Sequence, residues 1–289
     1  MQPYFNIDST YFVLLISLLG LIVGSFLNVV IHRLPKMMEK DWRSQCLSFL
    51  EMDEEKDTKV RYTLSQPPSH CPKCNHPISP FENVPLISFL LQKGKCRHCG
   101  EPISWRYPII ELISAILSAV IAFHFGMSSA VIFALLLTWA LIALTVIDLD
   151  HQLLPDSITL PFLWLGLILS TQNVFIDMQA SIIGAAIGYL SLWSIYWVFK
   201  IVTGKEGMGY GDFKLLSLFG AWLGWQSLPL IILLSAGVGA IVGISLILFK
   251  NHQRQQPIPF GPYLASAGWI AMLWGDQITK AYLDWALSI

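Results

Sequence analysis

Charged residues are scarce in this sequence of 289 residues: Asp, Glu, Lys and Arg make up 13%, whereas hydrophobic residues make up 54%. With a mean hydropathy of +0.58, this composition excludes an ordinary soluble domain. The chain also lacks basic residues before its first apolar run, which excludes a secretory signal peptide there. No Gly-x-Gly-x-x-Gly fingerprint is present, so no cofactor site can be located by that motif.

Most of the sequence consists of long apolar runs. They lie at about 11–31, 107–126, 129–147, 157–173, 178–199, 213–225, 228–249 and 259–287. A helix needs about 20 predominantly apolar residues to cross the hydrocarbon core. The sequence therefore predicts an all-α polytopic membrane protein with about eight transmembrane helices, the sixth of them short.

Lysine and arginine are unevenly distributed along the chain. Twelve of the 18 lie between Arg33 and Arg106, five more fall in or beside loops that eight spans place on the same side, and only Lys280 lies near the other side. Because cytosolic loops carry an excess of basic residues, the polar segment is predicted to face the cytosol. The basic residues follow loop topology rather than forming a stripe, so no nucleic-acid partner is predicted.

The composition changes abruptly near residues 32 and 107. These changes divide the chain into a first transmembrane helix at 1–31, a small cytosolic domain at 32–106 and a membrane domain at 107–289. A cytosolic insert of this size has too little apolar area to fold unaided, so it needs a further stabilising element. Cysteines within it are the candidates for that element.

Four of the five cysteines form two Cys-x-x-Cys pairs in the polar domain: Cys71, Cys74, Cys96 and Cys99. Each pair is followed by a small polar turn and then Pro-Ile, so the two halves match like the knuckles of a zinc ribbon. They predict a tetrahedral four-thiolate site for one structural zinc ion. Two disulfides are the alternative, which the reducing cytosol disfavours. His70, His76 and His98 could each displace a cysteine ligand, and Cys46 is expected to be a bystander.

Four aspartates fall at the predicted cytosolic edge of the membrane, where carboxylates are costly and become functional candidates. Asp148 ends an apolar run, and a negative charge at a helix C-terminus opposes the helix dipole, so helix stability does not explain it. Asp150, two residues on, would point to roughly the opposite face and further into water. Asp156 follows Pro155 and reads as an ordinary N-cap of the fourth helix.

Asp212 follows a loop whose bare glycine backbone, at Gly204, Gly207, Gly209 and Gly211, lets an extended peptide approach the main chain closely. Asp212 itself could also be a helix N-cap. If it converges with Asp148, the two carboxylates cannot both ionise easily and would share one proton. Such a pair hydrolyses a peptide when one member activates water and the other protonates the amide carbonyl. Spacing alone does not establish that the two meet.

Two other classes of protein fit parts of this pattern. An ion-coupled transporter with a zinc regulatory domain would also use membrane carboxylates, as a proton or cation relay. Its polar residues should then sit on repeated, broken helices near mid-membrane, whereas here they cluster at one face. A non-enzymatic scaffold held by a zinc ribbon gives no reason for a bare glycine loop leading to an aspartate at lipid depth.

Four segments carry a resemblance to a known family: Gly24-Ser-Phe-Leu-Asn-Val-Val-Ile-His-Arg-Leu-Pro35, Asp148-Leu-Asp-His-Gln-Leu-Leu-Pro-Asp156, Gly204-Lys-Glu-Gly-Met-Gly-Tyr-Gly-Asp-Phe-Lys-Leu-Leu216 and Pro259-Phe-Gly-Pro-Tyr263. They resemble the type IV prepilin peptidases, which are bacterial inner-membrane aspartic proteases of the Gly-x-Gly-Asp class. The match covers essentially the whole chain and includes both cysteine pairs.

The resemblance implies that the protein cuts the short basic leader from type IV prepilins and type II secretion pseudopilins. It implies that the cut falls just after a glycine on the cytosolic side, and that Asp148 and Asp212 are the catalytic pair. It further implies methylation of the new N-terminal amine with S-adenosylmethionine. The implied partners are prepilins, pseudopilins and membrane lipid, without any particular oligomeric state.

Several polar residues near the membrane edge have no role assigned by these motifs. Asn28, His32 and Arg33, at the cytosolic end of the first span, are polar candidates for the methyl-donor site. Glu206 is expected, with the shared carboxylates, to meet the basic leader. Glu111, one turn into the second span, either snorkels to the membrane interface or has a substrate role.

Overall fold

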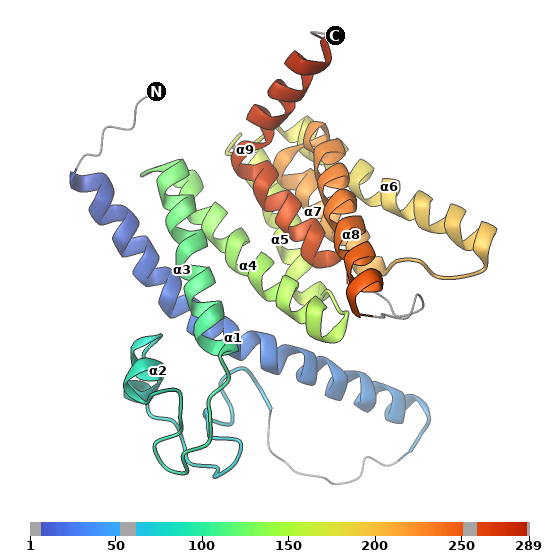
Figure 1. The fold of residues 1–289 in the computed structure, drawn as a ribbon. Helices are drawn as coiled ribbons and strands as arrows, with labels where there is room; N and C mark the ends of the chain where they lie inside the picture. Colours follow the sequence, from blue (N-terminus) through green and yellow to red (C-terminus); the bar gives the residue numbers. More distant parts are fainter. Residues whose placement is uncertain (1–6, 53–61, 251–258, 288–289) are drawn as a thin grey trace. The chain divides into compact units, whose positions relative to one another are not determined.

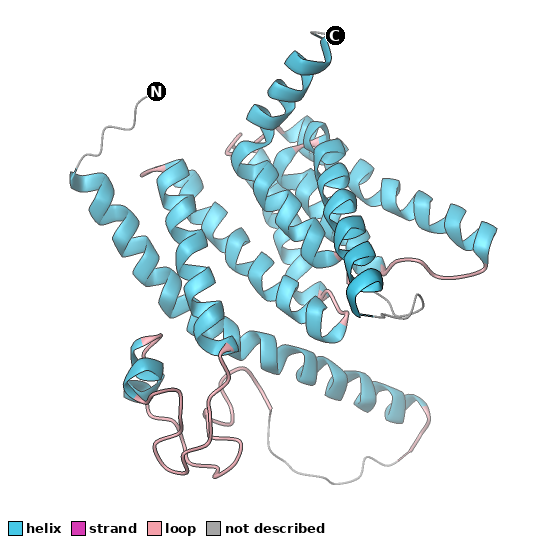
Figure 2. Cartoon of the chain, viewed as in Figure 1, coloured by secondary structure: helices cyan, strands magenta, loops and turns pink. Residues whose placement is uncertain are grey.

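The computed structural model describes residues 7–52, 62–250 and 259–287. Throughout these ranges the chain consists of helices joined by loops, and they contain no strand (Figure 1, Figure 2). The prediction of an all-α fold is therefore confirmed. The chain divides into two compact units, Met1–Ala143 and Leu144–Ile289.

Eight long helices occur in the described ranges: α1 (Ile7–Phe49), α3 (Arg106–Phe125), α4 (Ser129–His151), α5 (Asp156–Ser170), α6 (Met178–Thr203), α7 (Tyr210–Leu223), α8 (Leu228–Lys250) and α9 (Gly261–Leu287). Each corresponds to one predicted apolar run. Five stretches are long and apolar enough to cross a membrane: Ser9–Phe49, Arg106–Phe125, Ser129–His151, Met178–Thr203 and Trp225–Ser245. Length and composition thus confirm a multi-pass membrane protein and five of the roughly eight predicted spans.

Helix α1 does not end where the first apolar run ends, at residue 31, but continues to Phe49. The added turns contain Lys, Glu, Met, Gln and Leu, which favour a helix, and most of their side chains are exposed. The predicted first span is therefore the apolar half of a longer helix whose second half is polar.

In the first unit, α1 and α3 pack closely because small residues face each other. The Ser114 hydroxyl donates a hydrogen bond to the Gly20 carbonyl at 2.7 Å. A Cβ atom added at Gly24 would lie 2.8 Å from the Glu111 Cα. Any larger side chain at Gly24 would push α3 away. This contact therefore fixes the position of Glu111 against α1.

In the second unit, the short helix α7 is the buried centre and packs against α5, α6 and α9. Phe213, Phe219 and Trp222 are almost completely buried, and a helix that is apolar on all sides belongs in a core. The backbones of α6 and α7 touch where Gly184 meets Gly220. Helix α7 is thus held firmly on several sides, and its first turn carries Asp212.

Candidate active site and metal centre

Asp148 lies in the last turn of α4, as predicted, and its side chain is 5% exposed. Its Oδ2 accepts a hydrogen bond of 3.0 Å from the backbone N–H of Gly261, the first residue of α9. A Cβ atom at Gly261 would lie 2.6 Å from the same oxygen, so only glycine permits this approach. The Gly261 N–H therefore supplies the hydrogen bond that a buried carboxylate requires.

Asp212 is the third residue of α7 and is 6% exposed. The N-cap of α7 is Gly209, so the alternative that Asp212 is itself the N-cap is wrong. Its carboxylate instead accepts a hydrogen bond from the backbone of Gly209, as the third residue does in a capping box. A negative charge in the first helical turn is favourable, unlike the charge of Asp148 at the end of α4.

A chain of contacts brings the two aspartates together. Leu154, in the loop after α4, packs against both Gly211 and Gly261. A Cβ atom added at Gly211 would lie 2.7 Å from the Leu154 side chain, and one added at Gly261 would lie 3.2 Å from it. Gly211 precedes Asp212, and Gly261 contacts Asp148. The carboxylates are close enough for the charge of Asp148 to act on Asp212. Two buried carboxylates in this arrangement favour a shared proton, which is what acid–base hydrolysis of an amide needs.

The other two aspartates lie outside this buried pair. Asp150 is exposed, as predicted. The prediction that Asp156 caps the fourth helix is wrong, because Asp156 is the first residue of α5, the N-cap is Pro155, and no side-chain capping bond is made. Both Asp156 carboxylate oxygens instead accept hydrogen bonds of 2.7 Å from the ammonium group of Lys214. This half-exposed ion pair links the start of α5 to the second turn of α7.

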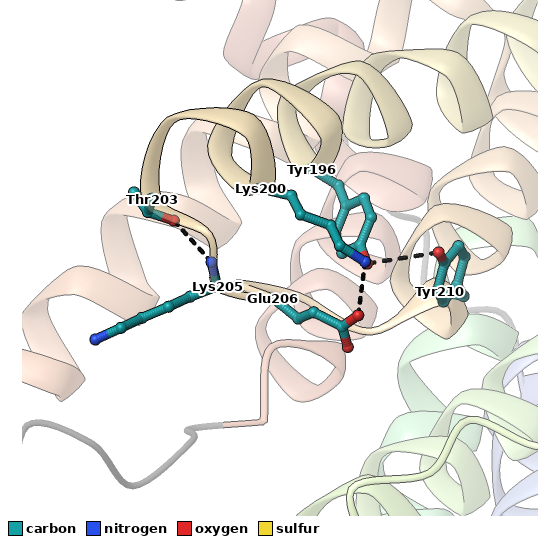
Figure 3. A network of polar contacts seen from close by, with 6 residues as sticks. All are labelled: Tyr196, Lys200, Thr203, Lys205, Glu206 and Tyr210. Carbon is teal, nitrogen blue, oxygen red and sulfur yellow. Dashed lines mark hydrogen bonds and ion pairs between the residues drawn. The ribbon is translucent and has the colours of Figure 1, made fainter.

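The loop Gly204–Gly209 is tied to α6 by a polar network (Figure 3). The Lys200 ammonium donates to Glu206 Oε1 at 2.8 Å and to the Tyr196 hydroxyl at 3.1 Å, and the hydroxyls of Tyr196 and Tyr210 lie 3.5 Å apart. The same ammonium holds the pKa of Glu206 below its usual range. Glu206, which we expected to meet the basic leader, therefore already has a cationic partner in the chain. The only sign of this network in the sequence is that Lys200 and Glu206, which have opposite charges, lie six residues apart.

The four cysteine sulfurs form the cluster that the two Cys-x-x-Cys pairs predict. Their Sγ atoms all lie within 4.8 Å of one another, and the Sγ atoms of Cys71 and Cys99 are 3.7 Å apart. Zn–S bonds of about 2.3 Å in a tetrahedron place the sulfurs roughly 3.8 Å apart. The donor set therefore fits a divalent metal ion. All four cysteines are free thiols, so the disulfide alternative does not describe this structure.

The two halves of the cluster have matching backbone turns. In each half the N–H of the first cysteine donates to the carbonyl five residues later, at 3.0 Å for Cys71 and 2.8 Å for Cys96. The residue four positions after the first cysteine has a positive φ in both halves, +55° at Asn75 and +73° at Gly100. Asn and Gly are the residues that adopt this conformation most readily. The matched turns expected from the sequence are confirmed.

Electrostatics around the sulfurs also suit a cation. Backbone N–H groups of Cys74 and Lys73 lower the pKa of Cys71 to about 6. The N–H of Glu101 acts in the same direction on Cys99, but burial and hydrogen bonds with the other cysteines outweigh it and raise the pKa of Cys99 to about 12. Four crowded thiols thus cannot all ionise together unless a positive ion balances their charge.

The remaining candidates near the cluster are not part of it. The imidazole rings of His76 and His98 stack at 4.1 Å, and His70 Nδ1 lies 3.1 Å from the Pro68 carbonyl. None of the three belongs to the group of possible metal ligands found in the described residues. Cys46 is exposed on α1 and is also outside that group.

Glu111 is 7% exposed and accepts a hydrogen bond of 2.9 Å from the backbone N–H of Leu86. The snorkelling alternative is therefore wrong, because packing against α1 holds this side chain inside the protein.

Sequence reasoning missed the role of Gly261, although it lies in the quoted segment Pro259-Phe-Gly-Pro-Tyr263. A glycine next to a proline at a helix start was the available signal.

Two family models together match most of the chain. Residues 18–125 match the bacterial Peptidase A24 N-terminal domain, and residues 135–244 match the type IV leader peptidase family. The two matches include both cysteine pairs and both buried aspartates. No solved structure is detectably similar to the chain.

Three similar curated proteins share the name prepilin leader peptidase/N-methyltransferase. The chain is 56% identical to the protein of that name from Aeromonas hydrophila over 269 residues, which cover 93% of each chain. It is 56% identical to the one from Pseudomonas aeruginosa over 95% of this chain and 94% of the relative. The protein from Legionella pneumophila is 44% identical over 94% of each chain.

Proposed function

Because the chain belongs to the type IV leader peptidase family, we propose that it removes the basic leader of type IV prepilins and then methylates the new N-terminal amine. The observation that carries the peptidase half is the convergence of two buried aspartates, Asp148 at the end of α4 and Asp212 at the start of α7. An ion-coupled transporter has no support in the comparisons. The names of the full-length relatives support both enzyme activities.

Hydrolysis proceeds through the shared proton of the Asp148–Asp212 pair. The ionised carboxylate takes a proton from a water molecule, and the oxygen of that water attacks the scissile carbonyl carbon. The protonated carboxyl of the other aspartate donates its proton to the carbonyl oxygen. Collapse of the tetrahedral intermediate breaks the C–N bond, and the carboxyl group that took the proton from water gives it to the departing nitrogen, which leaves as a free amine. The Gly261 N–H keeps Asp148 oriented throughout. No covalent intermediate is needed.

The charge of the loops and the position of the aspartates at the membrane edge support the proposed substrates and the proposed orientation of the protein in the membrane. Prepilins and the pseudopilins of type II secretion present a basic leader next to an apolar helix, which suits a site of carboxylates at the membrane edge. The distribution of 17 of 18 basic residues to one side supports an inner-membrane protein whose active site and cysteine domain face the cytoplasm. The apolar helix of the substrate and the surrounding membrane lipid are its expected neighbours.

Two groups complete the proposed enzyme. Cys71, Cys74, Cys96 and Cys99 would hold one structural zinc ion, which stabilises the cytosolic domain at 32–106 and leaves no ligand position for catalytic water. S-adenosylmethionine would supply an electrophilic methyl group to the amine nitrogen, which would lose a proton, and S-adenosylhomocysteine would be the leaving group. The second step therefore needs a binding site for this donor within the chain.

The purified protein in detergent, incubated with a prepilin and S-adenosylmethionine, tests both activities by mass spectrometry. We expect loss of the leader followed by gain of one methyl group on the shortened product. Protein carrying both Asp148→Asn and Asp212→Asn is the control for contaminating proteases. Intact prepilin after incubation with the unmodified enzyme would refute the proposed peptidase.

A further inference from the structure

We propose that a cavity in the first unit, Met1–Ala143, is the binding site for S-adenosylmethionine. The cavity lies among α1, the first turns of α3 and the segment that carries the cysteines, and its volume is about 510 Å³. Pockets for ligands of this size typically measure about 300–1,000 Å³. This assignment rests on the proposed methyltransferase function and adds the location of the donor, which no motif revealed.

Two buried charges of opposite sign line the cavity. Arg33 and Glu111 are each 7% exposed. In the described part of the chain, no ion pair joins either of them to an oppositely charged group. A buried charge is stable only where a group of opposite charge or hydrogen bonds compensate for its removal from water. The pair of unneutralised charges therefore points to a ligand that carries both signs.

Each of the two groups retains capacity for further hydrogen bonds. The Arg33 guanidinium donates to the carbonyls of Thr63, Leu64 and Pro67 at 3.0, 3.3 and 2.7 Å. A guanidinium has more N–H donors than these three bonds use. The Glu111 carboxylate accepts hydrogen bonds from the Leu86 N–H and from Ser25, and it too can accept more. The protein thus orients both side chains without saturating them.

S-adenosylmethionine carries a group of opposite charge for each of these two residues. Its amino-acid part carries a carboxylate, which suits the planar fork of Arg33. Its ammonium and sulfonium groups are positive, and they suit the carboxylate of Glu111. We infer that these two residues hold the methionyl end of the donor. Asn28, which uses its amide N–H groups on the Gly24 and Tyr107 carbonyls, leaves its own carbonyl oxygen to accept from the ligand.

Aromatic rings form another part of the wall, where an adenine would lie. Tyr62, Phe89 and Tyr107 line the cavity, and Phe89, on the short helix α2 (Ile87–Leu91), is held edge-on against Trp105 with ring centroids 4.9 Å apart. Aromatic side chains favour the stacking of any base, because every base has a π-face. The polar candidates Asn28, His32 and Arg33, named from the sequence, all line this same cavity.

Calorimetric titration of the purified, zinc-containing full chain with S-adenosylmethionine tests the assignment directly. The variant Glu111→Gln keeps the acceptor for the Leu86 N–H but removes the charge, and Phe89→Leu removes the ring but keeps both charges. We expect each to weaken binding at least about tenfold, the loss that 1.4 kcal/mol produces. The matched control Glu39→Gln removes a carboxylate from an exposed position on α1 and should bind like the unmodified protein.

Zinc content and leader cleavage serve as the measures of folding for these variants. If Glu111→Gln loses either, Phe89→Leu decides the question alone. Affinity equal to that of the unmodified protein in the folded variants would overturn this location while leaving the methyltransferase proposal intact. If the unmodified protein neither binds the donor nor transfers a methyl group, the methyltransferase function itself is refuted.

Discussion

The two units of this protein differ in the signs of the charged side chains that they bury. In Leu144–Ile289, two carboxylates of the same sign lie near each other at the ends of two helices. In Met1–Ala143, a guanidinium and a carboxylate line one cavity, and neither forms an ion pair with any residue that the structure describes. Like charges are useful where a proton must pass between groups, and opposite charges are useful where a zwitterion must be held. We therefore propose that hydrolysis takes place in the second unit and that the methyl donor binds in the first.

The largest expected effect comes from the aspartates. Asp148→Asn or Asp212→Asn should each lower leader cleavage at least about 10³-fold, because neither amide can replace a carboxyl in passing the proton. Binding of S-adenosylmethionine should not change in either variant. Asp150→Asn, an exposed neighbour, is the matched control and should retain nearly full cleavage. Cleavage by either of the first two at the normal rate would remove that residue from the pair.

Removing the metal ligands should affect the first unit more than the second. We expect roughly one zinc per chain in the unmodified protein and essentially none in protein carrying Cys71→Ser and Cys74→Ser. Methyl transfer should be lost, because the cysteine segment forms part of the cavity wall, whereas cleavage should survive at least in part. Metal analysis beside both assays checks this, with Cys46→Ser as the control. Loss of both activities in parallel would contradict the separation.

A smaller effect is expected from the glycine that contacts Asp148. Gly261→Ala places a Cβ atom 2.6 Å from the Asp148 carboxylate oxygen, and displacing a reacting group by about 1 Å can cost up to 10²-fold in rate. We predict a 10- to 100-fold fall in the cleavage rate constant, measured by single turnover. Gly237→Ala is the matched control, since a Cβ there meets nothing within 4 Å. Equal rates for the two variants would show that Gly261 does not position the aspartate.

The smallest effect should come from the network that ties the glycine loop to α6. Lys200→Gln breaks the ion pair with Glu206, and exposed pairs contribute roughly 0.2–1 kcal/mol. We therefore expect cleavage to fall by no more than about fivefold, with a smaller difference at high salt, where the pair is screened. Lys205→Gln, on the same loop, is the control. A loss as large as that of the aspartate variants would mean that Lys200 acts in the chemistry itself.

Local patterns predicted much of this molecule correctly. The apolar runs located the eight long helices, since a helix long enough to cross a membrane must be apolar along its length. The Cys-x-x-Cys pairs predicted the sulfur cluster because each turn is closed by bonds within six residues. Asp148 was found because its charge is unfavourable where it stands in the helix. These are features that neighbouring residues determine.

Contacts between distant residues account for what the sequence did not predict. Asp156 bonds Lys214, which is 58 residues away, instead of capping its own helix. Glu111 is buried by packing against α1 rather than snorkelling, and it accepts a hydrogen bond from Leu86, 25 residues earlier. Gly261 reaches Asp148 across 113 residues. Each partner is set by helix packing, which a single sequence does not specify.

The separation of the two chemistries is tested most directly with a pilin that already lacks its leader. The protein carrying both Asp148→Asn and Asp212→Asn is incubated with this mature pilin, whose N-terminal amine is free, and with S-adenosylmethionine. We predict that methyl transfer, followed by mass, proceeds at the rate of the unmodified enzyme, because the donor cavity belongs to the other unit. Failure of this variant to methylate, while it remains folded and holds zinc, would contradict the assignment.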